Sequence, residues 1–194
     1  PSVSAVAVST SSQTFLVNDV SIRVNAIWHS PSAKWQMTRP WSAAQAEWHA
    51  FSMSTDRIRL NANETPHCFG CGPANPRGLQ LEIFQDGTDA VATFTPTPDL
   101  GGWPDRLHGG VIGLLVDEML VYAGAPHDLW GVTAKVRYWL RKPIAFGDEL
   151  TLRSRLIQQS ERAFRATVAI HLPGEVLAAE GEGMCVLRRA PDED

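Results

Sequence analysis

Two glycines and two acids share one short segment of the sequence, and their types suit chemistry on a carbonyl group. The segment RLHGGVIGLLVDEML places Gly109 and Gly110 directly after His108, and the adjacent acids Asp117 and Glu118 follow within an apolar run. Buried charge is costly unless it is paired or used. Glycines at a helix start let a ligand approach free backbone N–H groups, which stabilise a developing oxyanion. A nearby acid can serve as a general base.

The same residues have structural interpretations. Gly109 and Gly110 could serve only to pack a helix start tightly against a strand. Asp117 could be a buried acid paired with an arginine or capped by hydroxyl groups, and Glu118 could be a polar residue at the rim of a subunit. Adjacent helical positions point about 100° apart, so we do not expect the two acids to share one role.

The spacing between Gly109 and Asp117 limits how they can cooperate. Eight residues at about 1.5 Å each separate them by about 12 Å along a helix axis. One catalytic site cannot easily span that distance within one helix. If both residues act on one carbonyl, two copies of the helix must lie antiparallel, with Gly109 of one chain facing Asp117 of the other. The spacing therefore favours a two-fold dimer with two shared sites.

The surrounding sequence predicts one helix and an antiparallel sheet. Residues 108–123 are predicted to be helical, with apolar side chains over most of the circumference, as in a helix that the fold encloses. Strand-like alternation before and after it gives the order β-β-α-β-β-β-β. The expected strands are 78–87, 88–98, 130–142, 148–160, 162–172 and 175–189, and 99–107 is expected to be a loop.

Composition fits a soluble globular protein. The chain has 194 residues, of which 44% are hydrophobic and 20% charged. A net charge of −4 argues against nucleic acid as a partner. No apolar run approaches the roughly 20 residues that span a bilayer, so we expect no membrane segment. Three cysteines do not suggest a disulfide framework, and a reducing, cytoplasmic location is the default expectation.

The composition changes near residue 60, which predicts an N-terminal extension (1–60) before the main domain (61–194). The extension is rich in serine, alanine and tryptophan. Within it, 41–53 is compatible with a short amphipathic helix docked on the main domain or on a partner. A poorly ordered extension is an equally good interpretation.

Three segments resemble one known family. LHGGVIGLLVDE resembles the His-Gly-Gly-x6-Asp/Glu motif of hotdog-fold acyl-CoA thioesterases of the phenylacetate-pathway (PaaI-like) type, in the 4HBT thioesterase superfamily. VTAKVRYWLRKPIAFGDELTLRSRL is similar to that family's strand after the helix, and CFGCGPANPRGLQLE resembles the upstream segment of many members. The resemblance covers about residues 65–188. It implies an α+β hotdog fold, in which a long antiparallel sheet wraps around a central helix, in a homodimer or a dimer of dimers.

The resemblance implies a thioester hydrolase and assigns roles to matching residues. Asp117 matches the carboxylate that acts as general base or nucleophile, and Gly109 matches the glycine whose N–H polarises the thioester carbonyl. His108 would orient the carbonyl or cap the helix, and Gly110 would contact substrate. Many members have asparagine in the loop before the histidine, where Asp105 is the nearest polar residue here. Attack by water and an anhydride intermediate both stay open.

Other matching residues are expected near the acyl-CoA substrate. Arg137, Arg141 and Lys142 would contact the phosphates of coenzyme A, for which arginine offers bidentate geometry, or they form a solvated strand face. Thr133 is expected to line the site, and Glu118 is a secondary candidate. The acyl group, and coenzyme A against a carrier protein, stay open. Four other arginines are expected to form cross-strand charge pairs: Arg153, Arg155, Arg162 and Arg165.

Two other functions occur on this fold. A non-catalytic acyl-CoA-binding ligand sensor would carry a DNA-binding module, but residues 1–60 show neither basic clustering nor a helix-turn-helix pattern. A hotdog dehydratase would pair its acid with a histidine in a different motif. The sequence therefore favours the hydrolase, with the ligand sensor as the alternative.

The pair Cys68 and Cys71, with His67 beside it, is compatible with a zinc or redox site. A structural zinc site needs four ligands, and the sequence has no second cysteine pair. A redox pair usually opens a helix, whereas glycines and prolines make this segment a turn. We therefore interpret the pair as part of a tight loop and expect no metal and no cofactor.

Overall fold

The computed structural model describes residues 58–61 and 65–188. The expected extension (1–60) lies almost entirely outside these residues, as does the expected helix at 41–53, so both stay predictions.

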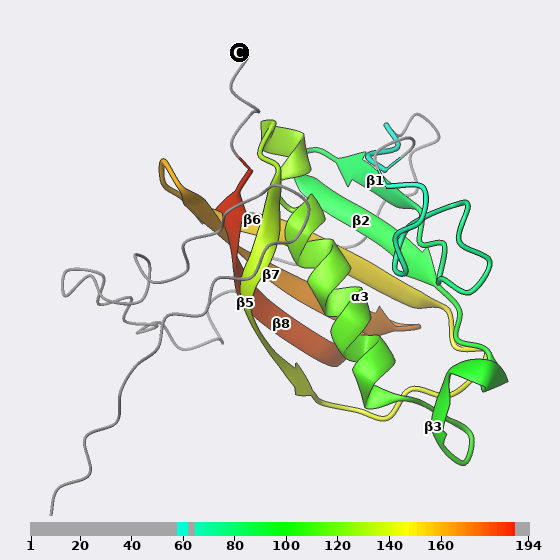
Figure 1. The fold of residues 1–194 in the computed structure, drawn as a ribbon. Helices are drawn as coiled ribbons and strands as arrows, with labels where there is room; N and C mark the ends of the chain where they lie inside the picture. Colours follow the sequence, from blue (N-terminus) through cyan, green and yellow to red (C-terminus); the bar gives the residue numbers. More distant parts are fainter. Residues whose placement is uncertain (1–57, 62–64, 189–194) are drawn as a thin grey trace, which may run out of the picture. The chain divides into compact units, whose positions relative to one another are not determined.

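One helix and a six-stranded antiparallel sheet form the core of the described part, and Figure 1 shows α3 lying across one face of the sheet. The strand order is β1-β2-β6-β7-β8-β5. This architecture confirms the expected α+β hotdog fold. The elements are β1 (Ile83–Asp86), β2 (Asp89–Phe94), the 3-10 turn η1 (Pro98–Leu100), β3 (Gly101–Trp103), β4 (Arg106–Leu107), α3 (Gly109–Tyr122), the 3-10 turn η2 (Ala125–His127), β5 (Gly131–Leu140), β6 (Leu150–Gln159), β7 (Ala163–Leu172) and β8 (Val176–Leu187).

The segment before the helix is more ordered than expected. Residues 99–107 contain a short antiparallel ribbon, β3–β4, instead of only a loop. Pro104 and Asp105 form its tip, where Asp105 has a φ of 58°. Figure 1 shows this ribbon beyond the end of α3 at which the helix begins. The glycine and proline content correctly indicated turns but could not reveal so short a pairing.

The helix packs closely on β8 because two glycines face it. A Cβ at Gly181 would lie 2.3 Å from Val116 Cγ1, and a Cβ at Gly183 would lie 2.7 Å from Leu120 Cδ1. Val116 and Leu120 are fully buried as a result. The contact fixes which sides of α3 face the sheet.

The expectation that the fold encloses the helix is wrong for one side. Gly110 is exposed, and Leu114, Asp117 and Val121 are half-buried. Their spacing places them on one stripe of the helix. The sheet covers the opposite side, where Ile112, Leu115, Val116, Met119 and Leu120 are buried. An apolar stripe with an acid at its centre therefore stays partly open to solvent in the single chain.

The expectation that no apolar run is long enough to span a membrane is corrected by the segment Gly109–His127. By length and composition alone, it is long and apolar enough to cross one. Its most apolar window is 50% buried inside the protein. Since its buried side chains pack against the sheet, its hydropathy is that of a core helix.

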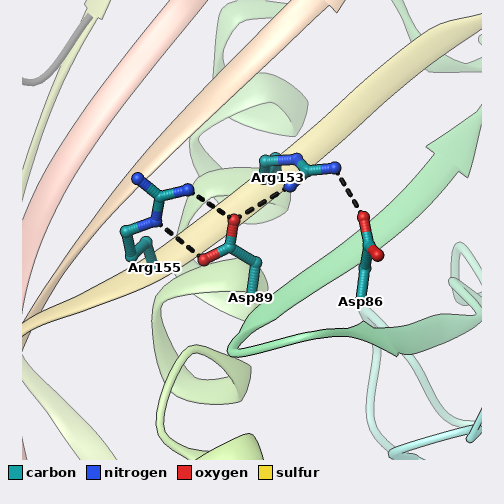
Figure 2. A network of polar contacts seen from close by, with 4 residues as sticks. All are labelled: Asp86, Asp89, Arg153 and Arg155. Atoms are coloured by element: carbon teal, nitrogen blue, oxygen red, sulfur yellow. Dashed lines mark hydrogen bonds and ion pairs between the residues drawn. The ribbon is translucent and has the colours of Figure 1, made fainter. Parts of the chain in front are cut away.

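A buried carboxylate joins β2 to β6, as Figure 2 shows. Asp89 is only 3% exposed, and it accepts hydrogen bonds from Arg153 Nη1 at 2.9 Å and from Arg155 Nε and Nη2 at 2.8 Å each. Arg153 also donates to Asp86 Oδ2 at 2.6 Å. The expected cross-strand charge pairing is therefore confirmed for Arg153 and Arg155, and Arg165 lies 3.8 Å from Glu182.

The Asp89 network yields a stability prediction. Asp89→Asn should lower the free energy of unfolding by about 3 kcal/mol, because it removes the buried negative charge that Arg153 and Arg155 share. Asp86→Asn, at a more exposed partner, should cost about 1 kcal/mol or less. Urea unfolding of both variants at one protein concentration measures the difference. Equal losses would contradict the special role of Asp89.

Candidate active site

His108 caps the start of α3 with its side chain. Its backbone is extended (φ −65°, ψ 133°), and its Nδ1 accepts a hydrogen bond from Gly110 N–H at 2.9 Å. Its carbonyl oxygen accepts from Val111 N–H at 2.9 Å, and its own N–H donates to Leu100 at 3.0 Å. Helix starts leave several N–H groups without partners, and the imidazole satisfies one of them.

The N–H of Gly109 stays available. Among the described residues, no backbone or side-chain acceptor is found for it. A Cβ at this position would lie 3.2 Å from the Leu140 Cδ1 methyl, so residue 109 packs closely against the end of β5. The Gly110 N–H, by contrast, is occupied by His108. Of the two glycines, Gly109 is therefore the one that offers a free donor at the positive end of the helix dipole.

Asp117 lies on the partly open stripe of α3. Its carboxylate forms no ion pair or hydrogen bond with any described residue, so the interpretation as a structurally paired acid finds no partner there. The charge of Asp117 acts on a thiol in β8. Burial raises the pKa of the Cys185 thiol to about 11; a hydrogen bond to Thr133 opposes the rise, and the charge of Asp117 adds to it.

A bulge in β5 decides which of its side chains face α3. Thr133 pairs with Cys185, and the register shifts before Lys135. Beyond the shift, Val136 pairs with Gly183 and Tyr138 with Gly181, the glycines on which α3 packs. Thr133 thus shares the helix-facing side of the sheet with three exposed apolar side chains: Val136, Tyr138 and Leu140.

Arg137 and Arg141 lie on the other face of β5. Arg137 Nε donates to Glu182 at 3.0 Å, and Arg141 Nε donates to the fully buried Glu180 at 2.7 Å. Both guanidinium groups also lie near the Trp139 ring, at 5.0 and 5.9 Å from its centroid. The cross-strand ion pairs make this face more than a solvated surface, and contact with coenzyme A stays a prediction for these arginines and for the exposed Lys142.

The two secondary candidates lie elsewhere. Asp105 is exposed at the tip of the β3–β4 ribbon. Glu118 points to the cysteine loop, defined here as residues 65–72, where its Oε1 accepts a hydrogen bond from Cys68 Sγ at 3.1 Å. Asp117 and Glu118 therefore have different surroundings, and their separate roles stay a prediction. Sequence reasoning missed the partner of Glu118, because it comes from a segment 50 residues away.

The surface hollow found among the described residues lies away from the predicted site residues. This hollow of about 470 Å³ lies between the segment after the cysteine loop and the residues that follow β2, and none of the predicted site residues lines it. Gly109 and Asp117 lie two turns apart on one helix, about 12 Å along its axis. Within the described residues of one chain, they therefore do not form a common pocket. The hollow is lined by Pro76, Arg77, Gly78, Leu79, Phe94, Thr95, Thr97, Asp99 and Leu100.

Comparison with solved structures agrees with this architecture. A thioesterase superfamily protein matches with a TM-score of 0.60 and 26% identity, over 75% of this chain and 73% of the other. The PaaI protein from the phenylacetic acid degradation operon of E. coli matches with a TM-score of 0.54 and 23% identity, over 58% and 82%. A Streptococcus mutans protein bound to acetyl CoA matches with a TM-score of 0.53 and 15% identity, over 56% and 88%. No family model and no curated protein matched the sequence.

The helix, the sheet order and these matches define a hotdog-fold protein. Within that class, the chain is similar to a thioesterase superfamily protein at 26% identity, and it shares its fold with the PaaI protein.

The contribution of the His108 cap to stability can be measured directly. His108→Ala should lower the free energy of unfolding by about 1 kcal/mol, because it removes the cap on Gly110. His108→Asn should restore most of that loss, since asparagine is among the best capping residues. Thermal and urea unfolding measure both variants. Equal stability of the alanine and wild-type proteins would show that the cap contributes nothing.

Proposed function

We propose that this protein is an acyl-CoA thioesterase whose active site is completed by a second copy of the chain. One observation carries the proposal: α3 has a free N–H at Gly109 and, two turns later, an unpaired carboxylate at Asp117 on an open stripe. Two such helices side by side and antiparallel place the donor of one beside the acid of the other. The similarity to thioesterase superfamily proteins supports the thioester hydrolysis.

The β5 edge supports a two-fold dimer. β5 is the last strand of the sheet, so one side of its backbone has no neighbour among the strands of the described part. Unpaired edges are templates for another strand. Pairing of β5 with β5 of a partner around a two-fold axis makes the strands antiparallel and does the same for the helices beside them. Gly113 lies against the Tyr138 ring, which keeps α3 close to this edge.

The chemistry follows from charge development on the thioester. The carbonyl oxygen gains negative charge as the carbon becomes tetrahedral, and the Gly109 N–H at the helix start stabilises that charge. Asp117 of the other copy either takes a proton from the attacking water or attacks the carbonyl carbon itself. The carbon–sulfur bond then breaks, and the sulfur leaves as the thiol of coenzyme A after taking up a proton. If Asp117 is the nucleophile, this step leaves a mixed anhydride, which water then cleaves to release the acyl group and restore the carboxylate. Net hydrolysis gives the free acid and the thiol.

The apolar residues beside the site suit the acyl group. Val136, Tyr138 and Leu140 are 40%, 38% and 51% exposed on the helix-facing side of β5. Leu114 is half-buried on the open stripe of α3. Exposed apolar side chains gathered beside a polar centre are typical of a ligand groove or an interface. A substrate at the dimer interface covers them. Arg137, Arg141 and Lys142 are the candidate contacts for the phosphates.

The cytoplasm is the location we propose for this activity. Cys68, Cys71 and Cys185 are all unpaired, as is usual in a reducing compartment.

Asp117→Asn should lower the turnover of acyl-CoA by about 100-fold or more, because the amide neither accepts a proton at neutral pH nor attacks a carbonyl. The measurement is release of free thiol from short, long and aromatic acyl-CoAs, with a protein-only blank for the cysteines. Asp128→Asn is the matched control: Asp128 is exposed, with a φ of 57° that asparagine tolerates, and its turnover should equal that of the wild type.

Unchanged turnover in Asp117→Asn would remove Asp117 from the mechanism. Acyl-CoA binding by the wild-type protein without any thiol release would favour the ligand sensor instead.

A further inference from the structure

A second cluster of reactive side chains lies where the cysteine loop meets α3. The ligand atoms of Cys68, Cys71 and Glu118 all lie within 4.8 Å of one another. Neither thiol is in a disulfide. The proposed hydrolysis uses none of the three groups, so their convergence needs another explanation.

We propose that Cys68, Cys71 and Glu118 bind one zinc ion, which fastens the cysteine loop to the core helix. Zinc accepts cysteine sulfur and carboxylate oxygen, and a pair of cysteines with two residues between them is a common arrangement of its ligands. Bonds of about 2.3 Å to sulfur and about 2.1 Å to oxygen place tetrahedral ligand atoms roughly 3.6–3.8 Å apart. The 4.8 Å limit of the cluster encloses that spacing. This proposal replaces the expectation of a metal-free loop.

The cysteine loop is shaped to admit the Glu118 side chain. A Cβ on Gly70, which lies between the two cysteines, would come within 2.3 Å of Glu118 Cγ and Cδ. Only glycine lets the carboxylate reach the thiols along this path. The N–H of Gly72 donates to the carbonyl of Cys68 at 3.0 Å and closes a tight turn. This turn brings the two cysteine sulfur atoms close to each other.

The loop is also held in place from the core side. The amide of Asn61, which is 3% exposed, donates to the carbonyl of Cys71 at 3.3 Å and to that of Leu81 at 2.7 Å. The N–H of Leu81 donates to the carbonyl of Gly70 at 3.0 Å. The three ligands are therefore positioned before any ion arrives, which lowers the ordering cost of binding.

The polar surroundings of Cys71 suit a metal-bound thiolate. The Tyr122 hydroxyl lies 3.4 Å and the Thr65 hydroxyl 3.5 Å from its sulfur, and both can donate to an anion. Such outer hydrogen bonds orient ligands and adjust their basicity. A divalent cation would supply positive charge that favours the thiolate form of Cys71. No described basic residue forms an ion pair with the neighbouring Glu118.

The donor set selects the ion and its role. Thiolates disfavour magnesium and calcium and favour zinc. Cys68 and Glu118 are half-buried, so water from solvent can take the fourth position. Asp117 lies about 100° around the helix from Glu118, on the partly open stripe. We therefore assign the ion a structural role.

The test measures zinc on the full chain after reduction. The wild type should retain one zinc per chain after saturation and desalting, as measured by mass spectrometry of the metal. Competition with a chromophoric chelator should show at least about tenfold weaker binding for Glu118→Gln, the size typical of losing one metal-site interaction. Cys68→Ser and Cys71→Ser should lose stoichiometric zinc. Cys185→Ser, which also removes a buried thiol, is the matched control and should retain it.

Cobalt provides a second readout. The wild type with Co²⁺ should show sulfur-to-cobalt charge-transfer absorption that Cys68→Ser weakens. If buried Cys71→Ser fails to fold, the half-buried Cys68 and Glu118 variants carry the test. Substoichiometric zinc in the reduced wild type, or unchanged affinity in Glu118→Gln, overturns the proposal. The zinc test does not measure thiol release from acyl-CoA, so failure of the zinc proposal and failure of the thioesterase proposal are distinguishable.

Discussion

The close packing of α3 on β8 is the constraint on which the other features depend. Gly181 and Gly183 let Val116 and Leu120 sit against the sheet, and this contact fixes the rotation of the helix about its axis. With that rotation fixed, the stripe that carries Asp117 stays partly open. A side chain larger than hydrogen at either glycine would push the helix away from the sheet.

The same rotation gives two adjacent acids different surroundings. Asp117 lies on an open apolar stripe, beside the strand edge that we propose to pair with a second copy. Glu118, about 100° further around the helix, reaches over Gly70 to the thiols of the cysteine loop. One turn of helix therefore carries the proposed base or nucleophile of one site and the proposed ligand of another. The zinc ion would hold the loop against the helix from the side that the sheet leaves uncovered.

Local patterns predicted the helix and the long strands, because the period of the apolar residues in the sequence indicates each type of element. The bounds of α3 differ from the prediction by one residue at each end. Three features depend on contacts through space or on a single extra residue, and no local pattern encodes them. These are the bulge after Thr133, which reverses the faces of β5; the pairing of Arg141 with Glu180; and the convergence of Glu118 with the cysteines.

The shared site is tested most directly by mixing two inactive chains. Gly109→Pro removes the proposed donor at a helical position that favours proline, and the extended backbone of His108 accommodates it. Gly109→Ala, which keeps the N–H, is its control. When Gly109→Pro is co-expressed with Asp117→Asn, half of the dimers contain one chain of each kind. Each mixed dimer has one intact site out of two, so thioesterase activity should return to roughly one quarter of wild type. No recovery in mixed dimers that have formed would contradict a site built from both chains.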